Sequence, residues 1–96
     1  MELSELGRRA EALYQRFRLQ LETEENIGKI VVFDVDSGDY ELDTTGIESS
    51  RRLRERHPVA NLYALRIGYK QNRCELKIEF IEQGKVSVTK MEEIEQ

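Results

Sequence analysis

Gly28-Lys-Ile-Val-Val-Phe-Asp-Val-Asp-Ser-Gly-Asp-Tyr-Glu-Leu-Asp43 joins an apolar run to an acidic turn. The run from Ile30 to Phe33 does not alternate with polar residues, which is typical of a strand covered on both faces. The Asp36-Ser-Gly-Asp39 segment has the composition of a tight turn, and Tyr40 to Leu42 can return as a second strand. The segment therefore predicts a β-hairpin.

The same residues also have a chemical interpretation. Val31-Val-Phe-Asp-Val-Asp36 resembles the opening motif of haloacid-dehalogenase-type phosphohydrolases, which implies Asp34 as nucleophile, Asp36 as second acid and a magnesium ion. That machinery needs parallel strands joined by helical crossovers, whereas this chain turns back at once, so the hairpin interpretation is preferred. We expect Asp34 and Asp36 to be structural and, two apart in a strand, to point to the same side.

Metal and cofactor sites are not expected. Asp34, Asp36 and Asp39 crowd a turn and could hold calcium, but residue 45 is Thr where an EF-hand loop needs a bidentate Glu. A turn explains the same composition through the backbone alone. The single Cys74 and single His57 leave too few ligands for zinc, so Cys74 is expected on an apolar strand face and His57 at a helix C-terminus.

The N-terminal segment has the spacing of an amphipathic helix. Apolar residues recur at steps of three and four, which predicts a long helix over residues 2–25 that ends near Asn26 to Gly28. This stripe could cover the sheet or bind a partner. Its members are Leu3, Leu6, Ala10, Leu13 and Phe17.

The rest of the chain predicts one short helix and more strands. Thr45 and Glu48 fit a capping box for a helix that runs to about His57. Residues 61–69 and 74–82 alternate in hydropathy, and a last strand runs from 86 to about 90. The expected fold is α+β, a long helix on a mainly antiparallel sheet in the order α-β-β-α-β-β-β. The expected core places Leu65, Ile67, Leu76, Ile78 and Phe80 against the first helix.

Length and composition limit the function classes. The 96 residues predict one domain over 1–96, with an acidic, frayed tail at 91–96. A net charge of −4 disfavours bulk affinity for nucleic acid or anionic membrane. The sequence has neither an apolar run of membrane-spanning length nor a secretory signal, so we expect a cytoplasmic protein with no membrane contact.

The sequence of this acidic chain contains one cluster of basic residues. It could bind phosphate, nucleic acid or an acidic protein surface, or it could be the solvated face of a helix with cations near its C-terminus. Nucleic-acid binding ranks third among the functions considered, because no aromatic residue or Gly-rich loop accompanies it. The cations are Arg51, Arg52, Arg54 and Arg56.

Five short patterns between Glu11 and Tyr69 suggest a family. They are Leu13-Tyr14, Glu24-Glu25-Asn26-Ile27-Gly28-Lys29, Asp36-Ser37-Gly38-Asp39-Tyr40, Pro58 and Leu65-Arg66-Ile67-Gly68-Tyr69. Together they resemble small uncharacterised bacterial proteins, often encoded beside a small aspartic-protease-like protein or a toxin-like partner. The resemblance implies an antitoxin-like or accessory role and transfers no catalytic residue. The chain departs from the pattern after Tyr69.

These observations favour a non-enzymatic protein-interaction module. The expected partner is the aspartic-protease-like or toxin-like protein, and one helix on a five-stranded sheet leaves surface that a homodimer could cover. The expected contacts are Leu3, Leu6, Leu13 and Phe17 on the first helix, with Arg51, Arg52, Arg54 and Arg56 on the second. The alternative is the phosphohydrolase that uses Asp34 and Asp36.

Overall fold

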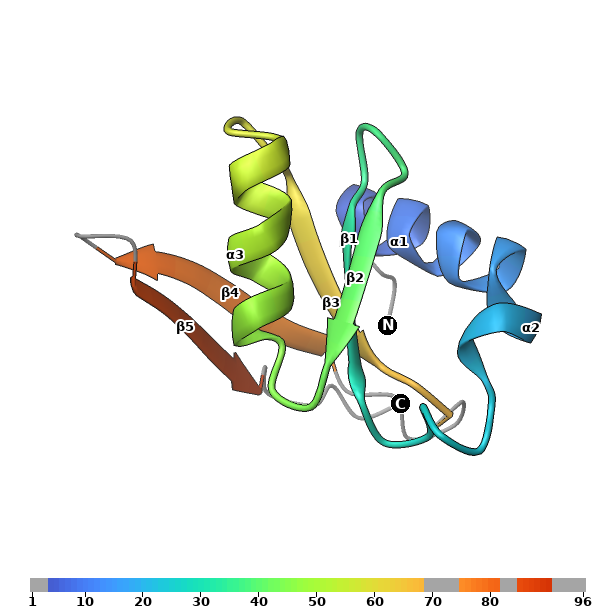
Figure 1. Cartoon of the computed structure of the whole chain (residues 1–96). Helices are drawn as coiled ribbons and strands as arrows, with labels where there is room; N and C mark the ends of the chain where they lie inside the picture. The colour runs from blue at the N-terminus through green and yellow to red at the C-terminus, as the bar shows by residue number, and fades with distance from the viewer. Residues whose placement is uncertain (1–3, 69–74, 82–84, 91–96) are drawn as a thin grey trace.

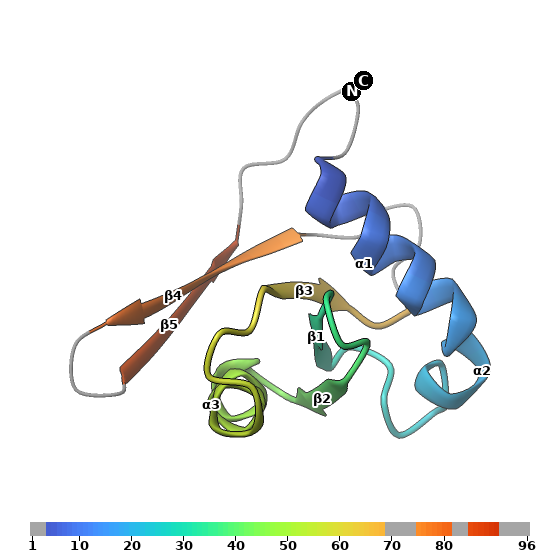
Figure 2. The same cartoon turned by 90° about the horizontal axis from the view of Figure 1, so that it is seen from above.

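The fold is α+β, as the sequence predicts. The computed structural model describes residues 4–68, 75–81 and 85–90. In these ranges a five-stranded sheet lies between helices on its two faces (Figures 1 and 2). The elements are α1 (Glu5–Arg16), α2 (Arg18–Leu21), β1 (Ile30–Asp34), β2 (Tyr40–Asp43), α3 (Ile47–Arg56), β3 (Leu62–Arg66), β4 (Glu75–Ile81) and β5 (Lys85–Lys90).

The N-terminal helix is shorter than predicted and is broken once. Ser4 caps α1 by accepting a hydrogen bond from the Gly7 amide at 3.0 Å. Phe17 leaves the helical conformation, with φ −103° and ψ 15°, and α2 then follows as a single turn. This break lets Phe17 pack on Tyr40 while Leu21 enters the core, with no exposed fraction. The expected order of elements is therefore matched only in part, and Leu3 lies outside the described residues.

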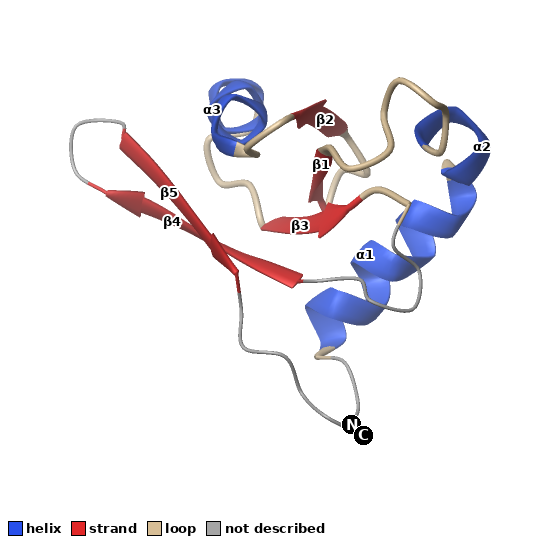
Figure 3. Cartoon of the chain, turned by 90° about the horizontal axis from the view of Figure 1, so that it is seen from below, coloured by secondary structure: helices blue, strands red, loops and turns tan. Residues whose placement is uncertain are grey.

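The strand order is β2-β1-β3-β4-β5, and every neighbouring pair is antiparallel. Val32 of β1 lies opposite Glu41 on one side and Ala64 on the other, so β1 is an interior strand. All five of its residues are buried, which confirms the prediction that both of its faces are covered. β3 pairs with β4 at Ala64↔Leu76 and Leu65↔Glu75, and β4 and β5 continue past that contact as a ribbon (Figure 3).

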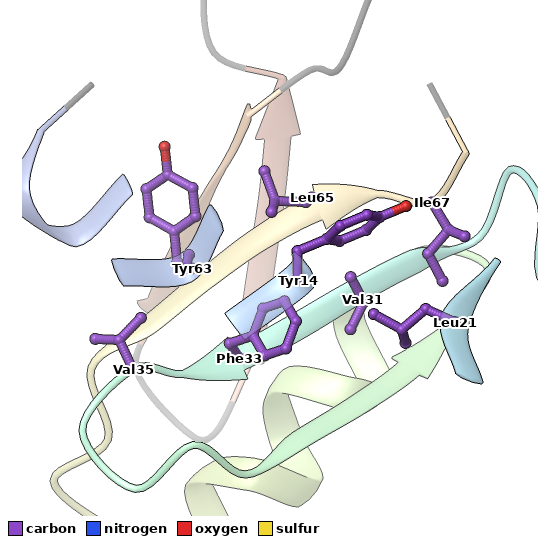
Figure 4. Close-up of a cluster of buried hydrophobic side chains, with 9 residues drawn as sticks. Tyr14, Leu21, Val31, Phe33, Val35, Tyr63, Leu65 and Ile67 are labelled. Carbon is purple, nitrogen blue, oxygen red and sulfur yellow. The ribbon is translucent and has the colours of Figure 1, made fainter. Parts of the chain in front are cut away.

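Two apolar clusters occupy the two faces of the sheet. On the face of α1 and α2, Tyr14 and Leu21 pack with Val31, Phe33 and the alternating side chains of β3 (Figure 4). That alternation confirms the predicted burial of Leu65 and Ile67. On the opposite face, the smaller cluster under α3 contains Ile30, Val32, Leu53 and Ala64. The side chains of Leu76, Ile78 and Phe80, and residues 74 and 91–96, lie outside the described part.

Asp43, not a capping box, organises the start of α3. Its carboxylate accepts hydrogen bonds from the amides of Gly46 at 2.8 Å and Ser49 at 3.3 Å, and from the Ser49 hydroxyl. The N-cap residue is Gly46, with φ +85°, and Glu48 instead pairs with Arg51. The predicted reciprocal Thr45–Glu48 arrangement is therefore wrong, although Thr45 Oγ1 does accept from the Ile47 amide. The cap comes from Asp43, at the end of β2, and a carboxylate three residues before the N-cap is not part of the capping-box pattern.

None of the described helices combines the length and the apolar character needed to cross a membrane.

Candidate functional site

Asp34 lies at the centre of the acidic hairpin. It ends β1 and is only 3% exposed. Its carboxylate accepts hydrogen bonds from the Ser37 hydroxyl at 2.8 Å, the Asn61 amide at 3.1 Å and the Asp36 amide at 3.3 Å. The turn also needs Gly38, whose φ is +82°. Asp34 thus joins the β1–β2 turn to the loop that leads into β3.

These contacts keep Asp34 ionised. Burial by itself would raise the pKa of Asp34, but the hydrogen bonds from the Asn61 amide and the Ser37 hydroxyl outweigh it. The nearby imidazole of His57 acts in the same direction, and the pKa of Asp34 is lowered from its ordinary value. The carboxylate is therefore a hydrogen-bond acceptor for its own turn.

Asp36 points away from Asp34, which corrects the prediction that both share a side. Arg9 of α1 binds the Asp36 carboxylate at 3.1 Å and also donates to the Val35 carbonyl at 3.2 Å. Asp34 instead lies 3.8 Å from the Nδ1 atom of His57, at the end of α3. The strand ends at Asp34, so the alternation that should align the two acids no longer applies. The two carboxylates do not form a pair.

His57 is the C-cap residue of α3, as predicted, and its side chain contacts the hairpin. Its Nε2 atom lies 2.9 Å from Asp39 Oδ2, and since a carboxylate only accepts, the imidazole donates there. Arg56 Nε donates to the same oxygen at 2.9 Å. Burial would raise the pKa of Asp39, but these two contacts with Arg56 and His57 hold it below its ordinary value. The end of α3 is thereby attached to the turn.

The predicted basic surface of α3 is largely used within the molecule. Glu41 of β2 binds Arg52 at 2.9 Å and Arg56 at 2.7 Å. Burial would raise the pKa of Glu41, but the hydrogen bonds from Arg56 and Arg52 lower it. Arg51 pairs with Glu48 at 2.9 Å, and Arg54 donates to the Pro58 carbonyl at 2.8 Å. All four predicted arginines lie on α3, each beside an internal acceptor.

The predicted stripe of the first helix is divided between core and surface. Ala10 is buried, and Leu6, Leu13 and Phe17 are partly buried against the same cluster. Leu13 and Phe17 border the β1–β2 hairpin. A Cβ atom added to Gly38 in the hairpin would lie 3.7 Å from Leu13 Cδ2, which is ordinary van der Waals contact. The rings of Phe17 and Tyr40 are 5.0 Å apart. The helix stripe therefore packs mainly on its own sheet.

The border between α1 and β2 forms what we call the apolar seam. Its four members are all partly exposed, and β2 is an edge strand of the sheet. Tyr40 and Leu42 project to the α1 face, because they pack against that cluster. These two residues were not predicted to lie at the surface, since a four-residue strand gives little hydropathy pattern. The seam consists of Leu13, Phe17, Tyr40 and Leu42.

Two further apolar side chains are almost completely exposed. Leu19 of α2 is 92% exposed, and Val59, in the loop between α3 and β3, is 89% exposed. Leu19 falls off the helical stripe, and an apolar residue in such a position is the sequence signal that could have identified it. The α3–β3 loop lies away from α2 (Figure 1).

Within the described residues, no group of three or more His, Cys, Asp or Glu side chains is arranged to hold a metal ion. No protein-family model, curated protein or solved structure matches this chain.

Proposed function

We propose that this protein is a non-enzymatic interaction module that binds another protein through the apolar seam. The observation that supports the proposal is the seam itself: four partly exposed apolar side chains where α1 borders the edge strand β2. An edge strand offers unpaired backbone groups, and apolar side chains beside it supply buried area, which is a common mode of segment recognition.

The charged residues near the hairpin also favour the apolar seam as the binding surface. Asp34, Asp39 and Glu41 accept hydrogen bonds from groups of their own chain, and Arg52 and Arg56 are donors in that network. Recruiting these groups for catalysis or for phosphate contacts would break internal bonds. A partner can cover the apolar seam without breaking those internal hydrogen bonds.

The proposed partner is the protein encoded beside this chain, with an antitoxin-like or accessory role for the module. This assignment comes from the resemblance of the hairpin and Leu65–Tyr69 patterns to small bacterial proteins with such neighbours. Inhibition would be steric, because a module seated by its sheet edge can block access to a partner's active surface.

Co-expression with the adjacent gene product tests the proposal. The two proteins should co-purify, and if the neighbour is toxic the module should restore growth. Phe17→Ser removes the central side chain of the seam and should abolish both effects. Leu6→Ser is the matched control, because Leu6 lies on the same helix and is also partly buried against the core.

Circular dichroism and thermal unfolding must show that both variants remain folded. The proposal is wrong if the adjacent protein neither co-purifies nor responds to the module. It is also wrong if folded Phe17→Ser and Leu6→Ser variants bind equally well, because the seam would then have no special part.

A further inference from the structure

The corner around α2 combines an exposed leucine with charges of both signs. Leu19 and Leu21 are two residues apart on α2, so they face in different directions. Leu21 is fully buried in the core, whereas Leu19 is 92% exposed. A single exposed leucine needs no explanation by itself. The neighbouring charges are what make this corner informative.

Three of those charges have no ionic partner within the described part of the chain. Within residues 4–68, Arg16, Glu24 and Glu25 form no ion pair, and all three are exposed. Arg16 ends α1 before Leu19, with its guanidinium 5.7 Å from the centre of the Phe17 ring. Glu24 and Glu25 follow α2 in an exposed turn. By contrast, nearby Arg18 is paired with Glu22 at 3.0 Å.

We infer that a second copy of this chain binds at this corner and forms a symmetric dimer. A twofold axis places the same patch on both sides of the interface, so the patch must be complementary to itself. Here Leu19 would pack near its equivalent, while Arg16 of each copy faces Glu24 and Glu25 of the other. A partner surface that carries only one sign of charge would leave either Arg16 or the two glutamates without an opposite charge.

This dimer is expected to be weak. A stable interface buries about 800 Å² on each partner, whereas this corner is built around one helix of four residues. Its ion pairs are solvent-exposed, so added salt should weaken it further. The dimer uses none of the four seam residues and does not rest on the proposed function.

Sedimentation of the full chain tests the inference directly. Over about 10 µM to about 1 mM, where weak complexes form, the mass should rise from the 11.3 kDa of one chain toward twice that value. Leu19→Ser should remain a single chain throughout. Val59→Ser is the matched control: it removes an equally exposed apolar side chain from another part of the surface, and it should behave like the wild type.

Charge exchange provides the sharper test. R16E and the double variant E24K/E25K should each fail to self-associate, because like charges then face each other. Mixed together, the two variants should associate. The carboxylate introduced at position 16 of R16E would face the two lysines of E24K/E25K. The unchanged Arg16 of E24K/E25K would face the native Glu24 and Glu25 of R16E. Both are surface changes, and circular dichroism should show an unaltered fold.

A wild type that stays at the mass of one chain across the whole range would overturn the inference. So would a Leu19→Ser or R16E variant that associates as the wild type does, or a mixture that associates no better than its separate components.

Discussion

The hydroxyl of Tyr14 should contribute a large share of the stability of this small domain. The Tyr14 side chain is fully buried, and its hydroxyl donates to Glu22 Oε2 at 2.6 Å. The Tyr14 hydroxyl oxygen also accepts a hydrogen bond from the Gly68 amide at 3.0 Å. One atom thus links α1 to the chain after α2 and to the end of β3. Tyr14→Phe removes that atom while keeping the buried ring.

The expected loss follows from the two bonds. A hydrogen bond to a charged group contributes about 1.5–3 kcal/mol, and a neutral one about 1 kcal/mol. Gly68 is only partly buried, so water can replace some of its lost bond. We expect Tyr14→Phe to lower the free energy of unfolding by about 2–3 kcal/mol, out of a total of about 5–15 kcal/mol for such domains. For a domain of this size that is a fall in Tm of about 10–20 °C.

Urea unfolding followed by circular dichroism measures this change. Tyr40→Phe is the control, because within the described residues the Tyr40 hydroxyl makes no hydrogen bond and the residue is partly exposed. It should stay within about 0.5 kcal/mol of the wild type, as surface changes usually do. If Tyr14→Phe is equally mild, the hydroxyl does not hold these three segments together.

Two further outcomes are expected. The pKa of Asp34, Asp39, Glu41 and Asp43 is lowered in the folded state, so their stabilisation is complete above the ordinary carboxyl pKa near 4 and is lost as the pH falls through the lower folded values. Unfolding midpoints measured from pH 7 to pH 2 should therefore decline below about pH 5, and Asp34→Asn should flatten that decline. Separately, the wild type should hydrolyse an aryl phosphate in the presence of magnesium no faster than the D34N/D36N variant does. The reason is that Asp34 accepts hydrogen bonds from its own turn and Asp36 binds Arg9. A magnesium-dependent rate that disappears in the double variant would contradict this prediction.

Much of the sheet could be predicted from local sequence. The unbroken run at Ile30–Phe33 predicted a strand covered on both faces, and the alternation after residue 61 predicted that Leu65 and Ile67 point into the same core. These patterns work because strand geometry places successive side chains on opposite faces. The break at Phe17 could not be seen in the same way, because the apolar spacing continues to Leu21 without interruption and the contact between Phe17 and Tyr40 joins residues far apart in the sequence.

The candidate site was less predictable, because its contacts join residues far apart in the sequence. Arg56 and Glu41 are fifteen positions apart, and Arg9 and Asp36 are twenty-seven apart. Before the fold is known, the arginines of α3 look like a free basic surface and Asp34 and Asp36 look like a catalytic pair. Side-chain charge is visible in a sequence, but the partner that neutralises it depends on the tertiary structure.

The position of β1 between two helical layers has an evolutionary consequence. A strand with one exposed face can accept polar substitutions at every second residue, and so can drift in sequence while the fold persists. β1 has no such positions, because all five residues are buried. Neighbouring β2, whose residues are all partly exposed, retains that freedom. Sequence divergence among proteins of this architecture should therefore accumulate along the edge that could meet a partner, while the interior strand stays nearly constant, so that binding preference can change without loss of the scaffold.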